Sequence, residues 1–290
     1  MLEVVIDPLS AALLGAFKAV VVPLPFFVLL AIILKGRSLF PDLKRAIGES
    51  RINLLIHFTD AILVAPILVG LSVVMEQSIG STGLVLVPST FWAGLHPAVV
   101  AFAAVFVGDF ISYWRHRLEH TPLLWPSHAI HHSDTEMTWL AIFRFHPINR
   151  FTTTITDYAF LLMMGFPPYA LLANSIIRHY YGALIHADLP WTYGPLGHVF
   201  VSPAMHRWHH AMDPKAYNTN YATVFSLFDT LFGTFRVPGK CDVPLGVAEK
   251  MGTGLVGQLA HPFKATSYRY LFRRTGLLGS IFSRTRSLRQ

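Results

Sequence analysis

Three long apolar stretches dominate the first part of the chain, at residues 16–34, 53–75 and 92–114. Each approaches the roughly 20 mostly apolar residues that a membrane-spanning helix needs. Pro23 and Pro25 should kink the first stretch, because proline removes a helical hydrogen bond. Asp60 and Asp109, in the other two, should face protein rather than lipid. The pattern predicts three membrane-spanning helices.

A fourth apolar region, residues 151–177, is split by Gly165, Pro167 and Pro168. Arginines flank it on both sides, at Arg150 and Arg178. We expect a helical hairpin that enters the membrane and returns to the same side. The alternative is one kinked span, which would put the two halves of a histidine-rich region on opposite sides.

Basic residues orient these spans, because lysine and arginine concentrate in cytoplasmic loops. Residues 1–17 and 52–114 contain neither, whereas the loop 35–51 contains five: Lys35, Arg37, Lys44, Arg45 and Arg51. This places the loop 35–51 inside and ends the third span inside at Arg115. The expected location is an integral, multi-pass position in a bacterial inner membrane or the endoplasmic reticulum.

Composition agrees with a membrane protein. The chain is 53% hydrophobic and 13% charged, whereas soluble domains carry roughly 25% charged residues. Cys241 is the only cysteine, which excludes an internal disulfide. The net charge of +7 reflects the C-terminal tail, where aromatic residues lie among arginines, a pattern that fits an anionic membrane surface better than nucleic acid.

We expect N-terminal helices over 1–90, a catalytic domain over 91–240 and a basic amphipathic cytoplasmic tail over 241–290.

The histidines form three clusters. The chain has 15 histidines against 16 Asp and Glu, and eight of them lie in HRLEH, HAIHH and HRWHH, as His116, His120, His128, His131, His132, His206, His209 and His210. Residues three or four apart on a helix are neighbours, so each cluster could converge on one ion. Eight imidazoles are too many for one metal and suit two adjacent ions.

Asp109 shares a helical face with the first cluster. Asp109, His116 and His120 lie within about 20° of one helical face. Asp109 is therefore a candidate either to orient a ligand or only to satisfy another polar group.

Other metal and cofactor sites fit less well. The motifs HExxH and ExxH are absent, which argues against common zinc proteases and carboxylate-rich di-iron bundles. Gly252, Gly254 and Gly257 match GxGxxG, but no strand precedes them and no acidic residue follows, so we expect no nicotinamide site. Imidazole suits both iron and zinc, and both stay open at this point.

The region from about Asp109 to Pro238 resembles the fatty acid hydroxylase and sterol desaturase superfamily of integral membrane di-metal oxygenases. The resemblance rests on HRLEH, LLWPSHAIHHSD, SPAMHRWHH, NTNYA and FDTLFGTFRVP, with RFHP, GFPP and HADLP in the family's order. It implies that the eight clustered histidines bind metal and that His146 of RFHP and His186 of HADLP complete the set. For His146 and His186, a hydrogen-bonding or capping role is the alternative.

The resemblance implies a fold and a function together. The fold is an all-α, multi-pass transmembrane bundle with a cytoplasmic-face helical cap that carries the histidine clusters. The function is hydroxylation or desaturation of a lipid C–H bond with O2, two iron ions and an external electron donor such as cytochrome b5, ferredoxin or a reductase. No catalytic residue is expected beyond the metal ligands. The alternatives are a histidine-rich membrane metal transporter and a zinc-dependent hydrolase.

Overall fold

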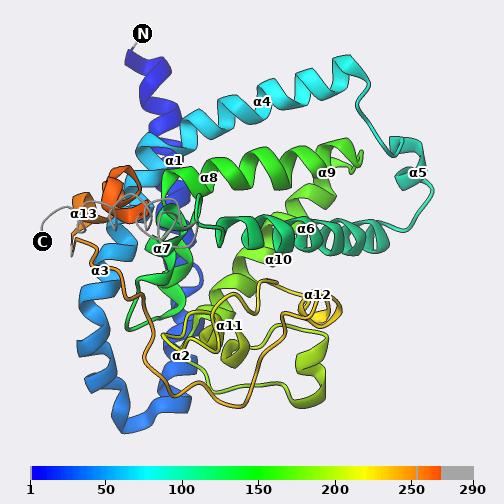
Figure 1. Cartoon of the computed structure of the whole chain (residues 1–290). Helices are drawn as coiled ribbons and strands as arrows, with labels where there is room; N and C mark the ends of the chain where they lie inside the picture. The colour runs from blue at the N-terminus through cyan, green and yellow to red at the C-terminus, as the bar shows by residue number, and fades with distance from the viewer. Residues whose placement is uncertain (1, 253, 269–290) are drawn as a thin grey trace, which may run out of the picture.

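Helices form the framework of the computed structural model, which describes residues 2–252 and 254–268 (Figure 1). Within these residues the only β-type pairing is an isolated bridge between Ala211 and Leu245. The prediction of an all-α fold is confirmed for this part of the chain.

The first predicted span is two helices with a break at proline. α1 (Leu2–Val21) ends before Pro23, and Pro23 then serves as the N-cap of α2 (Leu24–Lys35). The predicted kink in residues 16–34 is confirmed. A short turn, η1 (Gly36–Ser38), returns the chain into α3 (Leu39–Leu63), which packs beside α1 and α2.

The prediction that residues 53–75 form one membrane-spanning helix is wrong, because the chain bends within this stretch. The helix α3 ends at Leu63, and α4 (Ala65–Thr82) leaves it in a different direction (Figure 1). Pro66 occupies the first turn of α4. Its ring cannot donate a hydrogen bond and clashes with the carbonyl one turn earlier, so the chain bends before it.

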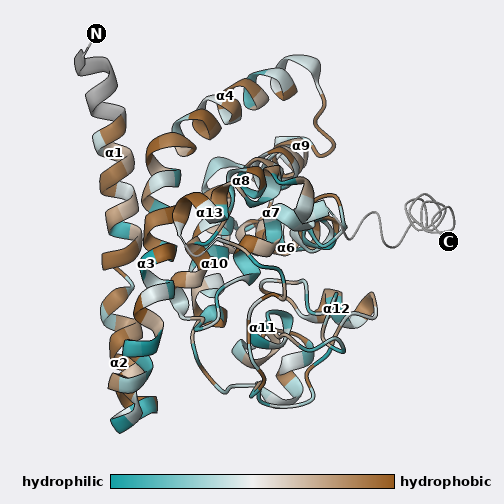
Figure 2. Cartoon of the chain, turned by 60° about the vertical axis from the view of Figure 1, so that its left-hand side comes forward, coloured by the Kyte–Doolittle hydropathy of each residue, from teal (hydrophilic) through white to brown (hydrophobic). Residues whose placement is uncertain are grey.

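The apolar surface is concentrated on the N-terminal helices. Within the described residues, two stretches are long and apolar enough to cross a membrane, Leu9–Leu63 and α6 (Pro97–Glu119). In the first, only 11% of the most apolar 18-residue segment is buried. Figure 2 shows hydrophobic residues along α1 and α4, and Ile33 and Phe40 are 68% and 78% exposed. Exposed apolar area of this extent marks a membrane or protein contact.

The third predicted span corresponds to α6. This helix begins later than predicted, at Pro97, because His96 caps its first turn by accepting a hydrogen bond from the Ala98 amide. A short helix, α5 (Ser89–Ala93), lies before it.

The predicted hairpin is present as two helical arms. The first arm runs through α8 (Pro147–Thr153), a π-helical turn η3 (Thr154–Tyr158) and α9 (Ala159–Met163), and the second is α10 (Pro168–His186). Gly165 reverses the chain with φ +65°, and a Cβ there would lie 2.1 Å from the Val87 carbonyl oxygen. The second arm packs along α6. Whether this hairpin enters a membrane stays a prediction.

Short elements and loops cover one end of these helices. They are α7 (Trp125–His132), η2 (Trp139–Phe143), η4 (Gly194–His198), α11 (Pro203–His209) and α12 (Leu227–Leu231). The core between them and α6 contains Tyr113, Ile185, Met205 and Phe228.

The tail contributes α13 (Leu255–Leu259), η5 (His261–Phe263) and η6 (Ala265–Tyr268). The rest of the predicted amphipathic tail, residues 269–290, lies outside the described residues. The predicted domain limits at 90 and 240 stay predictions.

A buried polar network ties α3 to the second histidine cluster. Arg144 is 1% exposed and donates to the Glu49 carboxylate, to Asn53 Oδ1 at 3.2 Å and to the Ile130 carbonyl at 3.2 Å. Asn53 in turn donates to Asp134 at 2.8 Å. Since Ile130 and Asp134 flank His131 and His132, this network sets the position of α7 relative to α3.

Replacing Arg144 with Met should destabilise the protein strongly, because Asp134 and Glu49 lose their counter-ion. Removing one partner of a buried ion pair costs about 3–5 kcal/mol. The matched control is Arg45→Met, whose side chain is 57% exposed and whose pairs should contribute less than about 1 kcal/mol. Unfolding in detergent by urea measures both, and equal losses would contradict the assigned role of Arg144.

Candidate metal centre

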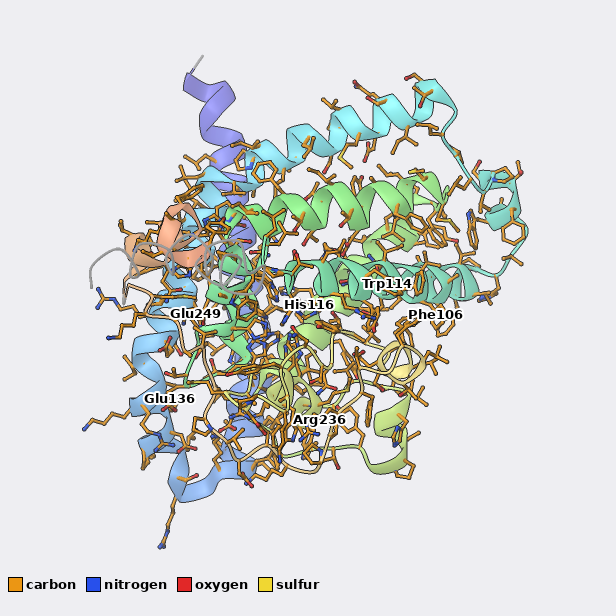
Figure 3. All side chains as sticks on the ribbon, viewed as in Figure 1. Phe106, Trp114, His116, Glu136, Arg236 and Glu249 are labelled. Atoms are coloured by element: carbon orange, nitrogen blue, oxygen red, sulfur yellow. The ribbon has the colours of Figure 1, made fainter. Side chains whose placement is uncertain are left out.

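The three histidine clusters meet at one place because three helices end there. HRLEH occupies the last turn of α6, HAIHH occupies α7, and HRWHH occupies α11. Prolines start the two short helices, and Ser202 caps α11 by accepting from the Met205 amide at 3.1 Å. In Figure 3, His116 lies at the centre of the molecule.

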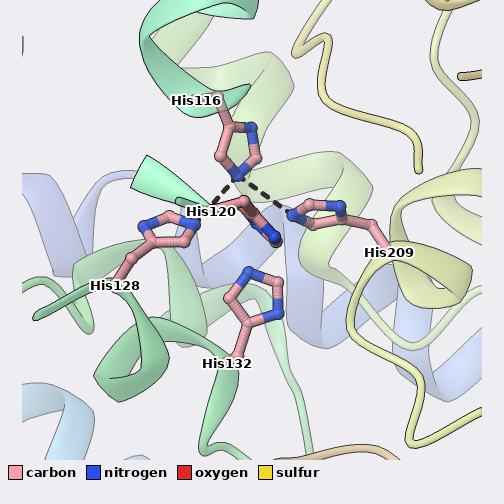
Figure 4. A group of neighbouring side chains, drawn as sticks. All are labelled: His116, His120, His128, His132 and His209. Carbon is pink, nitrogen blue, oxygen red and sulfur yellow. Dashed lines mark hydrogen bonds between the residues drawn. The ribbon is translucent and has the colours of Figure 1, made fainter. Parts of the chain in front are cut away.

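Five histidines form the first group (Figure 4): His116, His120, His128, His132 and His209. One ring nitrogen from each lies within 4.8 Å of all the others. His116 Nε2 lies 2.9 Å from His128 Nε2 and 3.0 Å from His209 Nε2. All but the partly exposed His120 are buried.

Four histidines form the second group: His131, His186, His206 and His210. His186 Nε2 lies 3.2 Å from His131 Nε2 and 3.0 Å from His206 Nε2, and His210 Nε2 lies 3.2 Å from His206 Nε2. The two groups adjoin, since the rings of His132 and His210 stack with centroids 4.3 Å apart.

The expectation that each cluster serves one ion is wrong for two of the three clusters. In HAIHH, His128 and His132 belong to the first group and His131 belongs to the second. In HRWHH, His206 and His210 belong to the second group and His209 belongs to the first. Helix geometry explains the division, because residues four apart lie about 40° apart around the axis and successive residues about 100° apart.

Hydrogen bonds at Nδ1 orient three of these rings. Nδ1 of His116 donates to the Tyr221 carbonyl, Nδ1 of His209 to the Thr219 carbonyl and Nδ1 of His186 to the Gly182 carbonyl, at 2.6–2.7 Å. A neutral imidazole that donates through Nδ1 presents a lone pair at Nε2. In the one close pair where both rings are held this way, His116 and His209 at 3.0 Å, the facing Nε2 atoms therefore have no proton to share.

A pair of aspartates holds the loop that supplies two of these carbonyls. Asp229 accepts the amides of Tyr221 and Ala222 at 2.7 and 2.9 Å. Asp109 accepts the amides of Thr223, Val224 and Phe225 at 2.8–3.2 Å. Asp109 thus acts on the loop rather than on a histidine. Partners of this kind orient metal ligands through their hydrogen bonds.

Sequence reasoning missed Asp229 and Glu119 as parts of the site, although both lie inside quoted motifs. Glu119, within HRLEH, is fully buried, and its Oε2 lies 3.4 Å from His128 Nδ1. Burial raises the pKa of Asp229 to about 6, against the lowering effect of its hydrogen bonds from Thr234 and the loop amides.

His146 does not join either group, contrary to expectation. Its Nδ1 accepts from the Ile148 amide at 3.1 Å, as the N-cap of α8, and its Nε2 donates to the Leu259 carbonyl at 3.1 Å. Both ring nitrogens are therefore occupied. His146 therefore has the capping role that was the alternative to metal binding, whereas His186 lies within the second group.

The remaining histidines lie outside both groups, as the motifs suggested: His57, His96, His179, His198 and His261. His179 borders the cavity described below, His57 Nε2 donates to the Ala16 carbonyl, and the exposed His198 stacks on Phe235.

The grouped rings are neutral near pH 7. Burial lowers the pKa of His186 to about 4. Burial, followed by neighbouring imidazoles, lowers the pKa of His128, His132, His206 and His210 well below 6.5. Neutral imidazole is the form that binds metal.

These features fit metal ions. His120 Nε2 and His132 Nε2 are buried and have no hydrogen-bond partner in the part of the chain that the structure describes. Nitrogen ligands about 2.1 Å from one ion lie roughly 3 Å apart, which is the separation of the paired Nε2 atoms. Nine neutral nitrogen donors in two adjoining groups could therefore hold metal ions.

Comparison with known proteins identifies one region of the chain. Residues 101–234, just under half of the chain, match the sequence profile of the fatty acid hydroxylase family. No solved structure matches the chain significantly.

Three relatives illustrate the range of proteins that the chain is similar to. The chain is 33% identical over 180 residues to ornithine lipid hydroxylase OlsE of Rhizobium tropici, covering 60% of this chain and 54% of that protein. It is 33% identical over 144 residues to the alkylglycerol monooxygenase of Caenorhabditis elegans, covering 49% and 28%. It is 30% identical over 131 residues to the Delta(7)-sterol 5(6)-desaturase ERG3A of Gibberella zeae, covering 45% and 36%. The match thus spans about half the length of the first relative and about a third of the others.

Metal content should separate His146 from the grouped histidines. Wild-type protein should bind two ions per chain, whereas His210→Ala should lose the ion of the second group because only three ligands remain. His146→Ala should keep both ions and lose about 1 kcal/mol of stability with its N-cap. Elemental analysis by mass spectrometry measures the ions, and equal metal loss in both variants would contradict this assignment.

Acid should destabilise the metal-free protein. In the unfolded chain, histidine has a pKa of about 6.5. In the folded protein, burial lowers the pKa of His186 to about 4, so the folded state binds protons only at lower pH. Stability should be fully present above about pH 6.5 and should fall as the pH drops from there towards about 4. Urea unfolding at several pH values measures this slope, which His198→Ala should leave unchanged. Stability that rises on acidification would exclude neutral buried imidazoles.

Proposed function

We propose that this protein is a membrane-bound, O2-dependent lipid oxidoreductase that hydroxylates or desaturates a C–H bond. The observation that carries the proposal is the pair of adjoining histidine groups that open onto one cavity. The cavity measures about 580 Å³, and His116, His128, His131, His186 and His206 form part of its wall. That volume lies within the range of small-molecule sites, about 300–1,000 Å³.

Iron is the metal that gives this site a redox function. The nine proposed ligands are His116, His120, His128, His132 and His209 for one ion and His131, His186, His206 and His210 for the other. Bound ferrous ions would supply the redox chemistry that activates O2 towards a C–H bond. In hydroxylation, one oxygen atom enters the C–H bond and the other leaves as water, with electrons from an external donor such as cytochrome b5, ferredoxin or a reductase.

The chain's own residues provide position and shielding. The carbonyls of Tyr221, Thr219 and Gly182 hold three rings in the tautomer that presents Nε2. The rings of Tyr221 and Trp125 lie 5.0 and 5.1 Å from the ring of His120, the one partly exposed ligand. These rings limit water access, which protects a reactive oxidant from side reactions.

The membrane position follows from surface and charge. The apolar faces of α1, α2 and α4 would contact acyl chains, and the basic loop 35–51 would lie on the cytoplasmic side. The first arm of the hairpin begins beside His146 and the second ends at His186, so both open ends lie near the histidine groups, which supports the prediction that they lie on one side. A lipid would enter the cavity laterally and a polar donor protein would dock from the cytosol.

The alternative functions have weaker support. A metal transporter or a zinc-dependent hydrolase could also use histidines, but the relatives reported above are named as hydroxylases, monooxygenases and a desaturase. The grouped histidines are enclosed rather than spread along a path through α1 to α4.

The direct test supplies iron-loaded protein in lipid vesicles with heavy-isotope O2, a reductant system and a total lipid extract. We expect lipids that carry one heavy oxygen atom, or lipids with a new double bond. His209→Ala should reduce the product at least about 100-fold, since even partners of metal ligands contribute about 10–100-fold. His198→Ala is the matched control and should keep wild-type activity. Product formation without O2, or an unaffected His209→Ala variant, would contradict the proposal.

A further inference from the structure

A tyrosine ring lies against three ligands of the first histidine group. The ring centroid of Tyr221 lies 5.0, 5.5 and 5.8 Å from the centroids of His120, His116 and His209. The side chain of Tyr221 is buried. A phenol gives up an electron to a strong oxidant more readily than an imidazole does. Tyr221 therefore lies where an oxidised metal centre could draw an electron from the protein.

Two further oxidisable rings continue from Tyr221 to the surface. The centroid of Tyr113 lies 5.9 Å from that of Tyr221, and the centroid of Trp114 lies 5.5 Å from that of Tyr113. These are the separations of aromatic rings in direct contact. Tyr113 is fully buried, whereas Trp114, which lies beside His116 along α6, is 38% exposed (Figure 3). We call Tyr221, Tyr113 and Trp114 the aromatic row. It connects buried ligands with a ring that a reductant can reach from outside.

One arginine covers the whole aromatic row. Arg117 has its Cζ atom near all three rings. The distances to the centroids of Tyr221, Tyr113 and Trp114 are 5.9, 5.8 and 5.1 Å. A guanidinium is always charged and stabilises the electron-rich face of a ring. It therefore opposes a positive charge on these rings, so a ring that loses an electron here is favoured to lose a proton as well.

Tyr113 has a hydrogen-bonded route for that proton. Its hydroxyl lies 2.9 Å from Thr234 Oγ1, and Thr234 donates to Asp229 Oδ1 at 2.6 Å. Because the single hydroxyl proton of Thr234 is used on Asp229, Tyr113 is the donor to Thr234. Arg117 donates to the same Tyr113 oxygen at 3.3 Å, so it offers no competing acceptor. Burial raises the pKa of Asp229 to about 6, and this carboxylate therefore takes up a proton more readily than an exposed one.

The surroundings of Tyr113 would suit a ring without a hydroxyl. Phe228 and Phe232 pack on it with centroids 6.3 and 5.4 Å away. Tyr113 also belongs to the hydrophobic core cluster that contains Phe228. Packing therefore accounts for the ring of Tyr113, whereas the hydroxyl contributes the route to Thr234 and Asp229.

We infer that the aromatic row is a protective relay, which supplies electrons to the metal centre when O2 has oxidised it without a substrate in place. This inference rests on the proposed function. An oxidant with no C–H bond to attack would otherwise react with its own ligands, a side reaction of the kind that enclosed sites must prevent. Phenols and indoles release electrons only to a strong oxidant, so the relay does not replace the external donor in the ordinary reaction.

Each relay event transfers one electron and returns the proton. An electron passes from Tyr113 through Tyr221 to the oxidised centre, while the Tyr113 proton passes to Thr234 and a Thr234 proton passes to Asp229. Trp114 then gives an electron to Tyr113, and the proton returns from Asp229 by the same route. A thiol or ascorbate at the surface restores Trp114 and is the reductant that is consumed.

The electron path is tested in metal-free, full-length protein in detergent. A photo-excited ruthenium complex with an electron acceptor in solution oxidises exposed indoles, and transient absorption distinguishes indole from phenoxyl radicals. Wild type should form a phenoxyl radical, and Tyr113→Phe and Trp114→Phe should each lose most of it. Tyr181→Phe is the matched control, because the Tyr181 hydroxyl donates to the Val201 carbonyl at 2.8 Å outside the aromatic row, and it should keep the wild-type yield. An unchanged phenoxyl yield in Tyr113→Phe would overturn the inference.

The protective role is tested with iron-loaded protein, O2 and a reductant system in the absence of lipid. Electron paramagnetic resonance of freeze-quenched samples detects radicals, and peptide mass spectrometry detects oxidised ligand histidines. Wild type and Tyr181→Phe should show an aromatic radical and largely intact ligands. Tyr113→Phe should lose the radical and accumulate oxidised His116, His120 or His209. Equally intact ligands in Tyr113→Phe and wild type would contradict the relay. A wild type that consumes no O2 would contradict the proposed function, and the metal-free experiment then decides whether the aromatic row conducts electrons.

Discussion

Nine imidazole rings share one buried volume, and the structure depends on keeping them neutral and aimed at two points. Burial lowers their affinity for protons, and carbonyl groups receive the Nδ1 protons of three of them. Between His116 and His209 the Nε2 lone pairs then face each other across 3.0 Å, an arrangement that a bound cation would stabilise.

Much of the fold serves that constraint. The loop that offers the carbonyls of Thr219 and Tyr221 is held by Asp229 and Asp109, which together accept five backbone amides. On the opposite side, Arg144 connects α3 to the backbone of α7. The N-terminal helices therefore do more than provide an apolar surface, since α3 braces the helix that carries three ligands.

The sequence allowed the convergence of the histidines to be predicted more reliably than the helices around them. HRLEH, HAIHH and HRWHH identified eight ligand candidates because helical spacing converts directly into proximity, and His186 followed from the resemblance alone. The division of HAIHH and HRWHH between two groups could have been predicted, since residues four apart share a face. His146 could not be separated from the ligands, because a capping histidine and a ligand look alike in RFHP. The bend at Val64 and Pro66 was missed because hydropathy alone does not show where an apolar helix ends, and Asp229 contacts its loop only through tertiary structure.

The central claim is that two adjoining histidine groups each hold one metal ion. Anomalous diffraction at the iron absorption edge, on crystals of iron-loaded protein, tests this most directly. The account predicts two separate peaks, one among His116, His120, His128, His132 and His209 and one among His131, His186, His206 and His210. A single peak, or a peak beside His146, would contradict it.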